Sequence, residues 1–72
     1  MKKFRRIASH EIVLEDLSRL TLSVVEIQQG VVTNCFPLTE EIPHTEWLPG
    51  EIVLRRDEEG HTRAYYNNVL IN

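Results

Sequence analysis

The sequence predicts an all-β fold: a small antiparallel sheet of about five strands, arranged as a meander that is either barrel-like or sandwich-like. Runs rich in β-branched and aliphatic residues recur along the chain, and polar turns that contain Gly30 or Gly60 separate them. With 72 residues and a hydrophobic content of 42%, the chain is expected to collapse into one small domain, 1–72.

The first two strands are expected at 7–14 and 20–27. The run IASHEIVL at 7–14 lacks turn formers and stops at the polar EDLSR. In LTLSVVEI, the apolar residues alternate as far as Val24 and then change phase, which indicates a bulge or burial on both faces. A helix over 14–29 is the alternative, because apolar residues recur there every three or four positions; the serine, threonine and valine residues disfavour it.

A tight hairpin is expected to join the second strand to a third strand, VVTNCFPL at 31–38. Gly30 supplies the positive φ angle that such a short connection needs. Pro37 has no amide donor, so it marks a strand end or an edge strand. A polar connection follows at 39–45.

The last hairpin is expected between EIVLRR at 51–56 and HTRAYYNNVLI at 61–71, with Gly60 in its loop. Neighbouring residues in a strand point to opposite faces of the sheet. Tyr65 and Tyr66 are therefore expected to separate, one packing in the core and the other lying on the surface or in an interface.

The charges are distributed unevenly along the chain. The net charge is -3, yet Lys2, Lys3, Arg5 and Arg6 lie within the first six residues and leave the rest strongly acidic. Residues 1–6 are predicted to form a flexible basic arm that could contact an anion. Nucleic acid is an unlikely partner, because the acidic remainder would repel it.

The composition also predicts a cytoplasmic protein that does not enter a membrane. No apolar run approaches the roughly 18 residues of a membrane span, and polar residues in IASHEIVLED interrupt the stretch that a secretory signal needs. The single cysteine, Cys35, can form neither an internal disulfide nor a cysteine-based zinc site. Because a small chain without such staples gains stability by pairing, a homodimer is expected.

The stretch from Ile7 to Leu54 resembles the N-terminal β segment of the amidohydrolase superfamily of metal-dependent hydrolases. The hairpin VEIQQGVV and the LPG before apolar residues in EWLPGEIVL carry this resemblance. It implies that the chain is a freestanding relative of the accessory β domain of those enzymes, without their catalytic barrel.

The same comparison implies that the chain is not an enzyme. In the family, the PG stretch leads to a His-x-His pair that binds the metal, and here Arg55 and Asp57 occupy those positions. Arginine cannot lose its proton to become a ligand. The few residues after Leu54 also fall far short of the roughly 250 of a (β/α)8 barrel. No cofactor is expected.

Two other groups of polar residues suggest metal sites. His44 and Glu46 are two residues apart, so in an extended strand both could contact one metal ion, with Glu40 or Glu41 close by. The other histidines, His10 and His61, have no motif spacing to this pair. The acidic run at 57–59 lacks the ligand spacing of a calcium loop and indicates a soluble hairpin tip. We expect no metal site.

Nucleophilic residues give no catalytic pattern either. Cys35 has no neighbouring cation and no helix N-terminus to lower its pKa, so it is expected to be a half-buried strand cysteine. Ser9, His10 and Glu11 are the residue types of a catalytic triad, but consecutive residues in a strand point alternately away from each other.

These observations favour a non-catalytic binding or protein-interaction module. Aromatic residues are enriched in interfaces, which makes Trp47, Tyr65, Tyr66 and Phe36 the candidate interface residues. The partner would be a second copy or another protein, bound through an edge strand or through an apolar face around Trp47 and Tyr66. The alternatives are an accessory subunit or fragment of a metal-dependent hydrolase, and a weak nucleic-acid binder that uses the basic arm.

Overall fold

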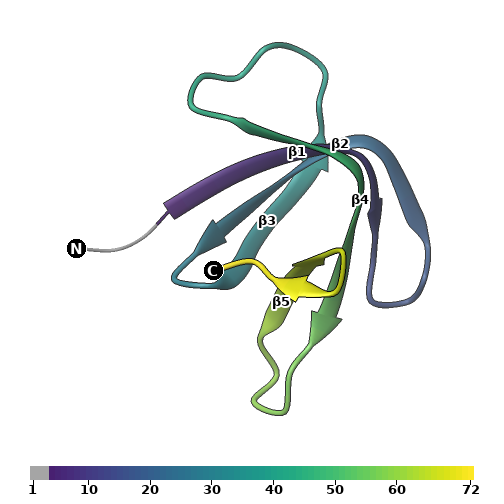
Figure 1. Cartoon of the computed structure of the whole chain (residues 1–72), viewed down its shortest axis with the longest axis vertical. Helices are drawn as coiled ribbons and strands as arrows, with labels where there is room; N and C mark the ends of the chain where they lie inside the picture. Colours follow the sequence, from purple (N-terminus) through teal and green to yellow (C-terminus); the bar gives the residue numbers. More distant parts are fainter. Residues whose placement is uncertain (1–3) are drawn as a thin grey trace.

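Six strands form one curled mixed sheet in the computed structural model, which describes residues 4–72 (Figure 1). The strands are β1 Phe4–Val13, β2 Arg19–Gln28, β3 Val31–Pro37, β4 Glu46–Arg56, β5 Thr62–Tyr66 and β6 Val69–Leu70. They lie side by side in the order β3-β2-β1-β4-β5-β6 and curl into a half-barrel. The all-β class is confirmed, and the helical alternative over 14–29 is wrong because β2 occupies most of that segment.

The sequence predicted a purely antiparallel sheet, and this prediction is wrong. Strand β1 pairs with β4 in parallel, while the other neighbours are antiparallel. A meander would place β4 beside β3, but here β2 and β1 lie between them. The connection at 38–45 must therefore cross two strands, and this crossing could not be read from local patterns.

The sixth strand is a second departure from the prediction. Residues 61–71 were expected to form one strand, but Asn67 and Asn68 have φ angles of 51° and 65° and turn the chain back. Asparagine tolerates this left-handed conformation better than most residues, and a two-residue turn with both φ angles positive matches strand twist. The short strand β6 then pairs with the end of β5.

The other predicted turns are confirmed. Gln29 and Gly30, with φ angles of 53° and 80°, form the hairpin between β2 and β3. Gly60, at 86°, lies in the turn between β4 and β5. The phase change in β2 reflects burial on both faces, one of the two predicted alternatives, because Val24 and Val25 are fully buried on opposite faces. Leu22 has a φ angle of 45°, but the register with β1 continues past it without a shift.

The core lies on the concave face of the sheet, which we call the inner face. A fully buried isoleucine contributes roughly 2 kcal/mol relative to an exposed one. Half-buried Leu48 and Tyr66 pack against this cluster. The buried core residues are Ile7, Ile12, Val25, Ile27, Ile52, Leu54, Ala64 and Ile71.

The two ends of the curled sheet approach each other. Strand β5 lies close to β3 although the two are not hydrogen-bonded neighbours. Arg63 in β5 spans the gap, because its Nη1 donates a hydrogen bond of 2.9 Å to the carbonyl oxygen of Gly30. Its Nε donates to Asp57 at 2.9 Å, so the guanidinium is held at both ends. This seam fixes the curvature that encloses the core.

The predicted flexible arm at 1–6 is wrong for its last three residues. Phe4, Arg5 and Arg6 pair with β2 as regular members of β1. These residues join the sheet because β2 extends as far as Gln28 and pairs with them. Lys2 and Lys3 lie outside the described residues. No helix in residues 4–72 is long and apolar enough to cross a membrane.

Replacing Gly30 by alanine tests the seam. A Cβ atom there would lie 2.9 Å from Nη1 of Arg63 and would force a left-handed alanine. Gly60 is a matched control, with a φ angle of 86° and no atom within 4 Å of the added Cβ. In urea denaturation, we expect Gly30→Ala to lower the free energy of unfolding by about 1 kcal/mol more than Gly60→Ala. Equal losses would contradict the role of the seam.

Candidate interaction surface

A row of apolar residues crosses four strands on the convex face, which we call the outer face. In the sheet register, Phe36 of β3 lies opposite Val24 of β2, Val24 opposite Ala8 of β1, and Ala8 opposite Trp47 of β4. Side chains of paired residues point to the same face, so the four form one surface. We call Phe36, Val24, Ala8 and Trp47 the Trp47 patch.

The patch has a buried floor and one exposed aromatic side chain. Val24 is 0% exposed and Ala8 2%, whereas Trp47 is 46% exposed. Trp47 thus stands on a packed base and presents its indole to solvent. Leu22, two residues before Val24 in β2, is equally exposed.

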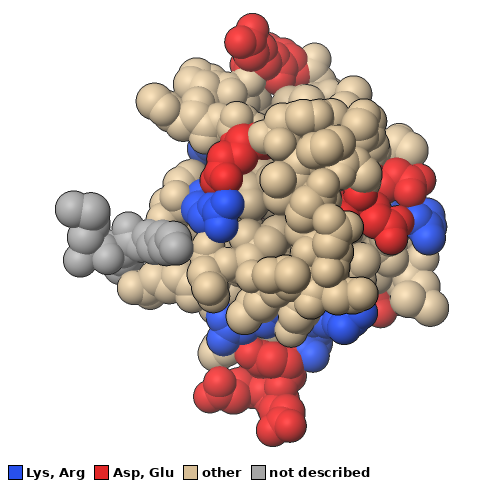
Figure 2. All heavy atoms as spheres, in the orientation of Figure 1, with Lys and Arg blue, Asp and Glu red and all other residues tan. Residues whose placement is uncertain are grey.

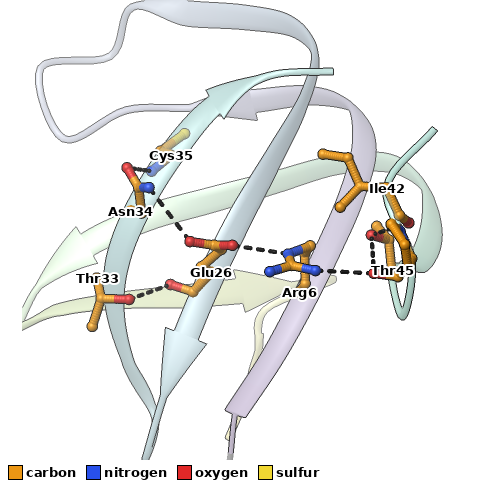
Figure 3. A network of polar contacts seen from close by, with 8 residues as sticks. Arg6, Glu26, Thr33, Asn34, Cys35, Ile42 and Thr45 are labelled. Atoms are coloured by element: carbon orange, nitrogen blue, oxygen red, sulfur yellow. Dashed lines mark hydrogen bonds and ion pairs between the residues drawn. The ribbon is translucent and has the colours of Figure 1, made fainter. Parts of the chain in front are cut away.

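The connection at 38–45 runs across the outer face and is tied to it. Arg6 Nη1 donates a hydrogen bond of 2.9 Å to the carbonyl oxygen of Pro43, and Arg6 Nε forms an ion pair of 2.8 Å with Glu26 (Figure 3). Thr45 Oγ1 donates to the carbonyl oxygen of Ile42 at 2.8 Å. Figure 3 shows the Ile42 side chain directed back toward β1 and β2. The loop therefore has a fixed path beside the patch.

The LPG stretch forms an irregularity in the parallel pairing of β1 and β4. The register shifts between Ser9 and Glu11, opposite Pro49 and Gly50, and Gly50 has a φ angle of 101°. Side chains supply the hydrogen bonds that strand pairing lacks at this point. Ser9 Oγ donates to the carbonyl oxygen of Gly50 at 2.9 Å, and the Tyr66 hydroxyl donates to the carbonyl oxygen of Pro49 at 2.6 Å. Buried peptide groups need such partners.

His10 links this irregularity to the Trp47 patch. The Gly50 amide donates a hydrogen bond of 3.0 Å to His10 Nδ1, and the imidazole meets the Trp47 ring edge-on with centroids 4.8 Å apart. Nδ1 must be unprotonated to accept this bond. No local pattern in the sequence predicts this contact, because it depends on which strands are neighbours.

The four predicted interface residues do not form one surface. Phe36 and Trp47 belong to the patch, whereas Tyr66 packs against the core on the inner face. Tyr65 lies on the outer face in a second row, beneath the guanidinium of Arg55 at 5.1 Å. The face around Trp47 and Tyr66 that the sequence suggested is therefore wrong, while the separation of the two tyrosines is confirmed.

The arginines expected to contact an anion are engaged within the protein. Arg5 makes two hydrogen bonds to Glu46, at 2.6 and 2.9 Å, and a third to the carbonyl oxygen of Asn72. The bond to Glu46 raises the pKa of Arg5 above its ordinary value. Arg6 pairs with Glu26. Both cations therefore already have carboxylate partners, which lowers their attraction for phosphate.

His44 and Glu46 were considered as metal ligands, and the structure does not bring them together with a third ligand. Among residues 4–72, Asp57, Glu59 and His61 are the group whose ligand atoms lie close enough to share an ion, within 4.8 Å. Asp57 is already used: its Oδ1 accepts the amides of Glu59 and His61, and its Oδ2 accepts Arg63. This arrangement is an ordered turn.

The other candidate chemical groups also have structural roles. Ser9, His10 and Glu11 do not contact one another as a triad, since Glu11 pairs with Arg19 while the first two bond Gly50. Cys35 is half-buried, and burial raises the pKa of its thiol, which leaves less reactive thiolate at neutral pH. No pocket indents the surface formed by the described residues.

Comparisons with known proteins do not assign the chain to a family. No family model matches it, and neither a curated protein nor a solved structure is detectably similar to it.

Asp57 gives a testable dependence of stability on pH. The amide of His61, the guanidinium of Arg63 and the amide of Glu59 hold the pKa of Asp57 below its ordinary value. A carboxyl group with a lowered pKa stabilises the fold at neutral pH, and this contribution is lost as the pH falls below about 4. We expect wild-type protein to lose more stability between about pH 6 and pH 3 than Asp57→Asn, measured by urea denaturation. Parallel curves would contradict this role.

Replacement of His10 tests its place between the bulge and Trp47. His10→Ala leaves the Gly50 amide without its acceptor, and we expect the free energy of unfolding to fall by about 1 kcal/mol. His61→Ala is the control, because its backbone makes the turn contacts. The emission maximum of Trp47, the single tryptophan, should shift in His10→Ala and stay at the wild-type value in His61→Ala. An emission maximum unchanged in His10→Ala would exclude the contact.

Proposed function

We propose that this chain is a non-catalytic protein-interaction module that binds its partner through the Trp47 patch. The observation that carries the proposal is Trp47 itself, 46% exposed above a floor in which Val24 is fully buried. Tryptophan is costly to leave in water and is enriched among residues that dominate binding energy. A large aromatic side chain on a rigid base also loses little freedom when a partner covers it.

The outer face is favoured over an edge strand as the binding surface. Strand β3 forms one edge, and its pairing with β2 shifts register between Glu26 and Ile27, which leaves Thr33 as an extra residue. The Cys35 amide donates to the side chain of Asn34, and Pro37 has no amide to offer. Bulges and prolines of this kind protect an edge against added strands. At the other edge, β6 is only two residues long.

The absence of a recognisable reaction centre agrees with a binding role. Cys35 is half-buried and His10 is bonded to the backbone, so neither is a free nucleophile or base. Small-molecule substrates usually enter a concave pocket, and the described surface has none. The proposed partner is therefore a macromolecule, either another protein or a second copy of this chain.

The test compares Trp47→Ser with Leu17→Ser, which removes an apolar side chain of 79% exposure from a turn outside the patch. We expect both variants to unfold within about 1 kcal/mol of wild type, because neither side chain is buried. Sedimentation equilibrium at tens of micromolar measures self-association, and affinity capture measures binding to other proteins. Trp47→Ser should lose the self-association or the capture that wild type shows, and Leu17→Ser should retain the same binding as wild type. Wild-type protein that neither associates nor captures a partner would refute the proposal.

A further inference from the structure

We propose that the Trp47 patch binds an extended peptide segment of another protein, one that carries lysine or arginine beside an apolar or aromatic residue. This inference rests on the proposed function and adds the chemistry of the partner. Two observations lead to it: unpaired carboxylates in the loop that leads to the patch, and the net negative charge of the chain itself.

The unpaired carboxylates belong to the loop that crosses the outer face. Glu40 and Glu41 are exposed and form no ion pair or hydrogen bond with any described residue. Their loop is tied down by the bond between Arg6 and Pro43, and it leads directly into β4, where Trp47 is the second residue. The two carboxylates therefore lie in the loop that leads to the exposed indole. A basic residue of a bound segment would be attracted by such carboxylates and by the face of an aromatic ring.

The described residues of a second copy offer few unpaired cations, and Lys2 and Lys3 lie outside those residues. Of the arginines in residues 4–72, Arg55 alone has no carboxylate partner, and it lies over Tyr65. The others are paired with acidic residues: Arg5, Arg6, Arg19, Arg56 and Arg63. Each copy also carries a net charge of -3, so two copies repel each other at low salt. Charge complementarity therefore favours a basic partner over self-pairing.

A second acidic site on the same chain provides a matched control. Glu58 and Glu59, in the turn between β4 and β5, are also exposed and form no ion pair. Figure 2 shows acidic side chains at opposite ends of the long axis, over the 38–45 loop at the top and at the β4–β5 turn at the bottom. If net charge alone attracted a basic peptide, both sites would contribute. If the patch binds it, Glu40 and Glu41 alone would matter.

The experiment pans a random twelve-residue peptide library on the full chain at low salt. We expect enriched sequences to combine lysine or arginine with an aromatic or aliphatic residue. Affinity for a synthetic copy of one enriched peptide is then measured by fluorescence anisotropy. Glu40→Gln/Glu41→Gln should weaken binding about three- to tenfold, and the loss should shrink at high salt. Trp47→Ser should weaken it further, whereas Glu58→Gln/Glu59→Gln should leave it unchanged.

The outcomes separate this inference from the proposed function. Enriched peptides without basic residues, or equal effects of the two double variants, would overturn the basic-peptide inference and leave an interaction surface at Trp47 intact. A dimer that depends on Trp47, with no enriched peptide, would identify a second copy as the occupant and would also overturn the inference. Peptide binding that is indifferent to Trp47→Ser would overturn both.

Discussion

The parallel pairing of β1 with β4 is the constraint on which the rest of this structure depends. It separates β4 from β3 by two strands, so the intervening chain has to cross the outer face of β2 and β1. The crossing loop is tied to this face through Arg6, beside the buried Ala8 and Val24. Trp47 lies where the loop rejoins the sheet. A simple meander of the same strands would have neither this loop nor the pairing that sets Trp47 beside Ala8.

The parallel pair also explains the side chains that look reactive in the sequence. Where the register shifts at Pro49 and Gly50, the peptide groups of these residues need partners that the ladder does not supply. Ser9, His10 and Tyr66 provide them. Their hydroxyl and imidazole groups are therefore structural, and they fix the position of the bulge and, through His10, of Trp47. The LPG stretch is thus part of β4, at the point where its pairing with β1 shifts register.

Local patterns in the sequence predicted most of the strands and turns, and failed where spatial arrangement decides. The hairpin at Gly30 and the phase change in β2 depend on neighbouring residues, so composition and periodicity were sufficient. The parallel partner of β1 depends on a long-range choice that no local pattern records. The turn at Asn67 and Asn68 does have a local signal, two consecutive asparagines, which tolerate positive φ angles. At the candidate surface, Trp47 and Phe36 could be named from their type, but their common face and the contact with His10 follow only from the register.

The guarded edge of β3 has a consequence for how the protein behaves at high concentration. A curled sheet of six strands with a free border is a template for fibril growth. Here the extra residue Thr33, the amide of Asn34 and the ring of Pro37 interrupt that template within seven residues. The edge of β3 is therefore poorly suited to pairing with further strands in a cross-β stack.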